Sequence, residues 1–140
     1  MENEQIHFVG KIAQKAIIEK NGKILVCRGI RDSVWEFPGG RLHIDESPQD
    51  GIRREILEEL NIQVTVQQPI HVCRSLHTKS NTWRILIAYH CSIQDNSAEK
   101  IDPNEVEDMK WISPAELKNL PMFDDCRETA DVFLKTKYGL

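Results

Sequence analysis

Residues 40–62 read GRLHIDESPQDGIRREILEELNI, and this stretch decides the fold of the chain around it. Ser47 and Pro48 open a helix, because serine is a preferred N-cap and proline fits the first helical position. Asn61 ends the helix, since asparagine tolerates the left-handed conformation of a C-terminal cap. The stretch therefore predicts a helix over 47–61, preceded by a glycine-containing loop.

Three carboxylates share one face of this predicted helix. At about 100° per residue, Glu55, Glu58 and Glu59 fall within an arc of about 100°. Gly51 lies on the same face, and a glycine there leaves room for a close approach. The expected core-facing stripe consists of the apolar residues Ile52, Ile56, Leu57 and Leu60.

Two interpretations of the carboxylate face are open at this point. Most runs of charge form a solvated surface. Like charges three and four residues apart repel each other, however, and only Arg54 offers local relief. The Gly39-Gly40 pair just upstream can also bring backbone groups close to an ion or a phosphate. Clustered oxygen ligands suit Mg²⁺ or Mn²⁺, so the residues support metal binding as well as a solvated face.

The remainder of the chain predicts one α+β domain over residues 1–140 with a mixed sheet and helices on its faces. Asn21-Gly22 is a strong signal for a two-residue hairpin turn. Proline and two glycines argue against regular structure over 35–40. The expected strands cover 15–19, 23–28, 62–75, 82–93 and 106–112, and the expected later helices are a short one after Ser113 and one over 124–138.

Composition narrows the function classes. The net charge is −4, and Lys and Arg are not clustered, which argues against a nucleic-acid polymer as partner. No apolar run reaches the roughly 18 residues of a membrane span. The four cysteines contain no C-x-x-C pair, which disfavours a disulfide framework and a structural zinc site, and they lack a paired histidine, which disfavours thiol catalysis. We therefore expect a cytoplasmic protein; a monomer and a homodimer both fit the sequence.

The spacing across 40–62 resembles the Nudix box, G-x5-E-x7-R-E-U-x-E-E-x-G-U, where U is aliphatic. Asn61 stands where the family has glycine, and asparagine serves the same left-handed cap. Residues 35–40 resemble the approach loop of MutT-type members, and 111–117 resemble their later strand-to-helix segment. The resemblance therefore extends over most of the chain.

The resemblance implies an α/β/α sandwich, with the catalytic loop and helix after the Gly-Gly turn, that hydrolyses nucleoside diphosphate-linked substrates with Mg²⁺ or Mn²⁺. Arg54 matches the arginine that orients the catalytic glutamates, and Arg41 matches a basic residue that stabilises charge on the reacting phosphates. Glu46 matches the supporting glutamate of the box. The matching metal ligands are Glu55, Glu58, Glu59 and the Gly39 carbonyl.

A further metal ligand is expected from a later loop, as the resemblance implies. Glu105 lies six residues before Trp111 and Glu107 lies four before it. Glu105 is preferred, although both could be ordinary loop charges. The general base is either Glu58 or a glutamate of this later loop.

Candidate substrate contacts are fewer and rest on weaker signals. Phe37 could touch a nucleobase, whereas Trp35 is expected in the core. His77 lies in a loop between strands. Asp124 and Asp125 open the last helix, where an N-cap and a first-turn acid are the simplest roles, and the resemblance adds a contact to the base.

Missing markers of other Nudix subfamilies favour a nucleoside triphosphate substrate, including oxidised nucleotides, cleaved to a monophosphate and pyrophosphate. One alternative is a nucleotide sugar or dinucleotide such as ADP-ribose. The other is a non-catalytic module that senses a nucleotide, which the complete box disfavours.

Overall fold

The computed structural model describes residues 5–77, 80–95 and 98–140. The elements are, in order, β1 (Lys11–Lys20), β2 (Lys23–Gly29), β3 (Gly39–Arg41), α1 (Pro48–Leu60), β4 (Gln63–His77), β5 (Thr82–Asp95), β6 (Val106–Ile112), α2 (Pro114–Asn119) and α3 (Asp124–Tyr138). Within these described ranges, no helix has the length and apolar character needed to cross a bilayer.

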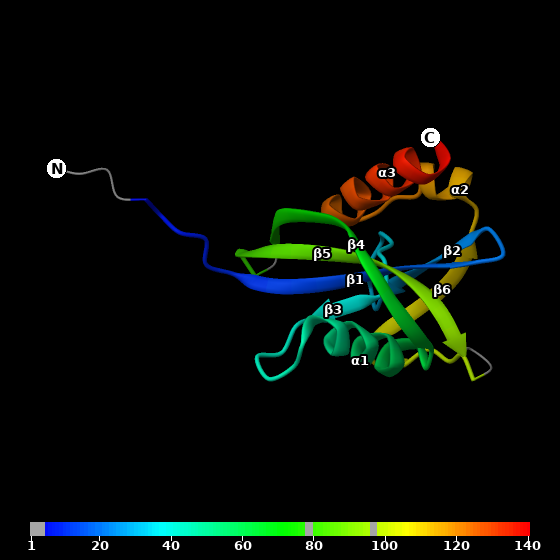
Figure 1. Ribbon diagram of the computed structural model, residues 1–140, viewed down its shortest axis with the longest axis horizontal. Coiled ribbons are helices and arrows are strands. Elements are labelled where there is room, and N and C mark those ends of the chain that lie inside the picture. Colours follow the sequence, from blue (N-terminus) through cyan, green and yellow to red (C-terminus); the bar gives the residue numbers. More distant parts are fainter. Residues whose placement is uncertain (1–4, 78–79, 96–97) are drawn as a thin grey trace.

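The strands form one mixed sheet in the order β4-β5-β1-β2-β6, with β3 paired to β1 outside this path. β1 and β5 run parallel, and the other pairs run antiparallel. Figure 1 shows α1 on one side of the sheet and α2 and α3 on the other. This arrangement confirms the predicted α/β/α sandwich with a mixed sheet.

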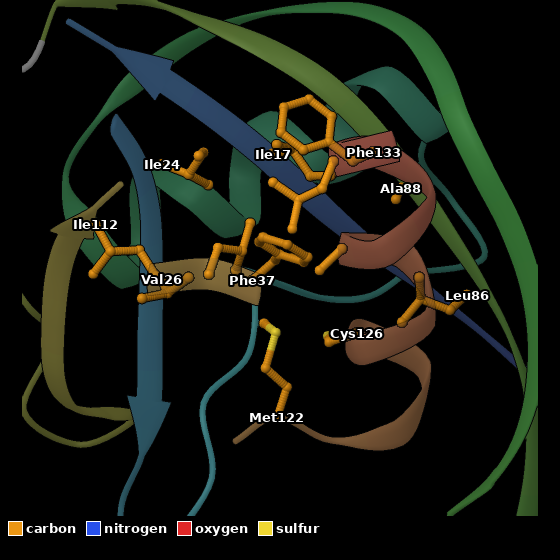
Figure 2. Close-up of a cluster of buried hydrophobic side chains, with 13 residues drawn as sticks. Ile17, Ile24, Val26, Phe37, Leu86, Ala88, Ile112, Met122, Cys126 and Phe133 are labelled. Atoms are coloured by element: carbon orange, nitrogen blue, oxygen red, sulfur yellow. The ribbon is translucent and has the colours of Figure 1, made fainter. Parts of the chain in front are cut away.

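Successive side chains of each strand point to opposite faces of the sheet, and each face carries its own hydrophobic core. Ile17 of β1 points into the α3 side, where it packs with Phe133 among others (Figure 2). Its neighbours Ala16 and Ile18 point into the α1 side, together with Ile56 of that helix. Because both sides are packed, α1 is held firmly against the sheet, which fixes the position of its carboxylates.

The caps of α1 are those that the sequence predicts. The Ser47 side chain accepts a hydrogen bond from the Asp50 N–H at 3.2 Å, and Asn61 adopts the left-handed conformation with φ of 54°. Three of the four predicted core residues of the helix are buried, but Leu57 is 45% exposed. Its inclusion was wrong because it lies at the edge of the apolar stripe.

The glycine pair forms regular structure, contrary to expectation. Gly39–Arg41 is a short strand whose Gly40 lies opposite Gln14 of β1. Gly39 has φ of +146°, and a Cβ there would lie 2.0 Å from the Gln14 carbonyl oxygen. The close approach of the β3 backbone to β1 therefore requires glycine at this position. The same glycines that argued against regular structure thus allow β3 to pair with β1.

Other boundaries differ by small amounts. β1 begins four residues earlier than predicted, at Lys11, where its pairing with β5 also begins. Asn21 and Gly22 both have positive φ, which confirms the hairpin turn. The four cysteines are free thiols, as expected.

Candidate active site

Three carboxylates converge at the carboxyl-terminal half of α1. Glu55 and Glu59 come from the helix, and Glu105 comes from the segment before β6, with one oxygen from each within 4.8 Å of the others. Glu107 instead pairs with Arg28, at 2.5 Å. The three oxygen donors suit a hard divalent cation, and the geometry brings Glu105 to them rather than Glu107.

Two of the three carboxylates, Glu59 and Glu105, border a cavity of about 370 Å³, which is also lined by Gly39 and Glu36. Burial, joined by repulsion from Glu55 and opposed by Lys15, raises the pKa of Glu59 to about 8. Burial and the Glu55 charge likewise raise the pKa of Glu105. The cluster thus gathers negative charge that a cation would neutralise.

Arg54 joins the box loop to the glutamates. Its guanidinium donates to both oxygens of Glu46, at 2.7 and 2.8 Å, and to Glu55 at 3.0 Å. A hydrogen bond from Arg54, and another from the His43 backbone N–H, lower the pKa of Glu46 to about 2. Arg54 therefore links the Glu46 and Glu55 carboxylates through its hydrogen bonds.

Glu58 lies beside this network rather than within the three-oxygen cluster. Its side chain is half exposed and accepts from Arg54 at 3.2 Å. Arg41 is exposed, its carbonyl accepts from Arg54 at 3.3 Å, and it lines a cavity of about 590 Å³ shared with Glu55. Both residues thus lie near the carboxylates, with charged groups that solvent can reach.

Lys15 is a charged residue of this region that sequence reasoning missed. Its side chain is buried, and its Nζ donates to Glu36 at 2.6 Å and to the Gly39 carbonyl at 3.5 Å. Burial alone would lower the pKa of Lys15, but the Glu36 charge raises it overall. The available signal was a lysine inside the mostly apolar stretch 12–18, where an unpaired charge would be costly.

Gly40 and Gly51 both accommodate neighbouring side chains. A Cβ on Gly40 would lie 2.5 Å from the Glu55 carboxylate. A Cβ on Gly51 would lie 2.9 Å from the Gln14 side-chain oxygen and 3.0 Å from Glu46. The space predicted at Gly51 is therefore filled by the chain's own loop and strand.

A second cavity, of about 410 Å³, shares Asp32 and Glu36 with the carboxylate cavity. His77, Asp124 and Asp125 all line it. Asp124 is exposed, whereas Asp125 is buried and accepts hydrogen bonds from Arg84 and Ser75. The structure thus gathers three of the four candidate substrate contacts around one cavity next to the metal-ligand candidates.

Two details of this region differ from expectation. Phe123, rather than Asp124, is the N-cap of α3. Phe37 is fully buried among Ile17, Val26 and Met122 (Figure 2), so its ring faces the core and not a nucleobase. Trp35 is the more accessible aromatic, half-buried with Lys110 over its ring at 4.3 Å.

Known proteins share both the sequence pattern and the fold. The NUDIX domain model matches residues 13–132. A CTP pyrophosphohydrolase of Escherichia coli (strain K12) is 32% identical over 111 residues, covering 76% of this chain and 78% of that protein. A MutT-like protein of Streptomyces ambofaciens is 29% identical over 101 residues, covering 72% of this chain but only 62% of that relative. The solution structure of the E. coli ORF135 protein has a TM-score of 0.78 at 27% identity, over 92% of this chain and 91% of the other. The chain therefore belongs to the Nudix family, whose members are hydrolases of phosphoanhydride bonds that generally need divalent cations.

Proposed function

We propose that the chain hydrolyses nucleoside or deoxynucleoside triphosphates, including oxidised ones, to a monophosphate and pyrophosphate with Mg²⁺ or Mn²⁺. The observation that carries the proposal is the convergence of Glu55, Glu59 and Glu105 oxygens within 4.8 Å of one another. Beside them lies a cavity of about 410 Å³, which suits a nucleoside. A polyphosphate extending from that cavity would reach the carboxylates.

The residues divide the work by their positions. Glu55, Glu59 and Glu105 would hold the cation, with the Gly39 carbonyl on the same cavity wall. A bound divalent cation neutralises phosphate charge and lowers the pKa of an attacking water. Arg54 fixes the orientation of Glu55 through its hydrogen bond at 3.0 Å.

Proton transfer and charge stabilisation fall to other groups. Glu58 is exposed beside Arg54 and can accept the proton of the attacking water, the role that a later-loop glutamate such as Glu105 would otherwise take. Arg41 lines the cavity on the other side of Glu55, where its charge can stabilise the phosphates. His77, Asp124 and Asp125 line the nucleoside side.

The E. coli CTP pyrophosphohydrolase supports a triphosphate substrate, because its similarity extends over three quarters of both chains. The four free thiols agree with a reducing, cytoplasmic setting. We expect a small nucleotide as the partner and a monomer or homodimer as the working form.

A substrate panel tests the proposal. Purified chain is assayed with Mg²⁺ or Mn²⁺ against ordinary and oxidised triphosphates, nucleotide sugars and ADP-ribose, with phosphate and pyrophosphate followed separately. Pyrophosphate released from a triphosphate, and lost in Glu59→Gln, is the expected result. Turnover of sugar or dinucleotide diphosphates alone would overturn the substrate class. Nucleotide binding without any turnover would indicate a sensing module instead.

A further inference from the structure

A second group of metal-ligating side chains lies outside the active site, between β4 and α3. His71 and Cys73 project from the strand and Glu128 projects from the helix, with one ligand atom from each within 4.8 Å of the others. The His71 Nε2 atom lies 2.6 Å from a Glu128 carboxylate oxygen. These three residues, the His-Cys-Glu cluster, share none of the Glu55, Glu59 and Glu105 ligands.

The backbone explains why the cluster forms. His71 and Cys73 are two residues apart on β4, so their side chains lie on the same face of the strand. That face meets α3, where the Cys73 Sγ lies 3.9 Å from the Asp125 carbonyl oxygen. Linear ligand spacing could not disclose the cluster, because its third member comes from an element more than fifty residues later in the chain.

The donor set differs chemically from that of the active site. An imidazole nitrogen, a thiolate and a carboxylate oxygen form a ligand set of intermediate softness, which suits Zn²⁺ better than Mg²⁺. Ligand atoms around a tetrahedral Zn²⁺ are separated by roughly 3.3–3.8 Å. Side-chain rotations that displace the ligand atoms by about 1 Å would bring their separations into that range.

We propose that His71, Cys73 and Glu128 form a Zn²⁺-binding site, with its fourth position open to solvent. Solvent can reach it: the Glu128 side chain is 57% exposed and that of His71 is 22% exposed. Binding would join the nitrogen, sulfur and oxygen atoms to the ion and release the thiol proton to the buffer.

The site would connect two of the elements that line the 410 Å³ cavity. Ser75 and Asp125 line that cavity, and each lies only two or three residues from a member of the His-Cys-Glu cluster. A bound Zn²⁺ would therefore tie β4 to α3 beside the cavity. Without an ion, the His71 and Glu128 pair is an ordinary surface contact between strand and helix.

Cobalt substitution tests the site independently of catalysis. The whole reduced chain is titrated with Co²⁺ in excess Mg²⁺, which occupies the carboxylate site. We expect one tetrahedral Co²⁺ per chain, with a sulfur-to-cobalt charge-transfer band, and displacement of this band by Zn²⁺. Oxygen ligands alone cannot give a sulfur band, so binding at Glu55, Glu59 and Glu105 is distinguished.

Variants identify the ligands. Cys73→Ser should abolish the charge-transfer band, whereas Cys91→Ser should retain it, because Cys91 is buried on the α1 side. His71→Ala and Glu128→Gln should each weaken Zn²⁺ affinity by at least roughly tenfold, a loss already typical of residues that only support a ligand. Absence of the band in the unmodified chain, or its survival in Cys73→Ser, would overturn the proposal. If Cys73→Ser does not fold, unchanged Zn²⁺ affinity in His71→Ala and Glu128→Gln would overturn it equally.

Discussion

The Arg54 guanidinium donates two hydrogen bonds to the Glu46 carboxylate, at 2.7 and 2.8 Å. The same guanidinium reaches Glu55 at 3.0 Å, so one planar group links the box loop to a metal-ligand candidate. A lysine cannot reproduce this forked geometry, because its three N–H donors radiate from one nitrogen and do not lie in a plane. The position of Glu55 therefore depends on Arg54 being arginine.

Replacing Arg54 tests this relationship. Arg54→Lys should lower kcat by roughly 10–100-fold, the loss typical of residues that support ligands, while the chain stays folded. The matched control is Arg53→Lys, since Arg53 is exposed and pairs with exposed Asp50 at the surface. Steady-state kinetics at saturating Mg²⁺ measure both, and equal activity of the two variants would refute an orienting role for Arg54.

Gly40→Ala should damage the site while sparing the fold. The added Cβ would lie 2.5 Å from the Glu55 carboxylate, the end of a flexible side chain that can swing away. We expect that a higher Mg²⁺ concentration is needed for half-maximal activity. The free energy of unfolding should change by less than about 1 kcal/mol. Urea unfolding and a Mg²⁺ titration of the rate separate the two effects. An unchanged Mg²⁺ requirement would contradict the expectation that Mg²⁺ binding depends on the position of the Glu55 carboxylate next to Gly40.

The ion pair between buried Lys15 and partly exposed Glu36 should stabilise the fold beneath the site. Lys15→Met leaves Glu36 without its partner at 2.6 Å and should cost about 1–3 kcal/mol of unfolding free energy, because the partly exposed Glu36 keeps some contact with solvent. The double variant Lys15→Met/Glu36→Gln removes both charges and should recover a large part of this loss. Urea denaturation measures each variant; a double variant no more stable than Lys15→Met would contradict the pairing.

Asp125 should contribute to the pH dependence of stability. Burial raises its pKa, but the Arg84 charge and hydrogen bonds from Arg84 and Ser75 outweigh burial and hold the pKa below 3.8. Because the folded pKa is the lower one, this stabilisation is present above about pH 4 and is lost as the pH falls through the folded pKa.

Asp125→Asn should therefore lose stability at about pH 7 and lose progressively less as the pH is lowered and the native carboxyl becomes protonated. Asp131→Asn is the control, since Asp131 is exposed and pairs with Arg127 one helical turn away. Urea midpoints at about pH 7 and along a series of lower pH values measure the difference. An Asp125→Asn penalty that does not shrink in acid would show that the charge is not responsible.

The sequence was most informative where local rules act alone. The caps at Ser47 and Asn61 and the shared face of Glu55 and Glu59 follow from helix geometry, and the structure shows them as predicted. The features that the sequence did not predict depend on tertiary contacts. Phe37 and Trp35 have similar local surroundings in the sequence, yet packing under the sheet buries the first and leaves the second half-exposed.

Charge inside a strand was equally hard to interpret. Lys15 falls in a mostly apolar stretch, and its partners Glu36 and the Gly39 carbonyl, 21 and 24 residues later, make its burial possible. Glu105 shows the opposite case, because its spacing from Trp111 favoured it and the structure then brought it to Glu55 and Glu59. Long-range pairing is thus accessible from sequence only where a motif fixes the spacing.

The most direct test of the carboxylate metal site compares Glu105→Gln with Glu107→Gln. The two residues are neighbours in the same segment, but Glu105 faces Glu55 and Glu59 while Glu107 faces Arg28. Mn²⁺ affinity measured by paramagnetic resonance should fall by roughly tenfold or more in Glu105→Gln and stay near the unmodified value in Glu107→Gln. Equal affinities in the two variants, or a greater loss in Glu107→Gln, would contradict the assignment of Glu55, Glu59 and Glu105 as the metal site.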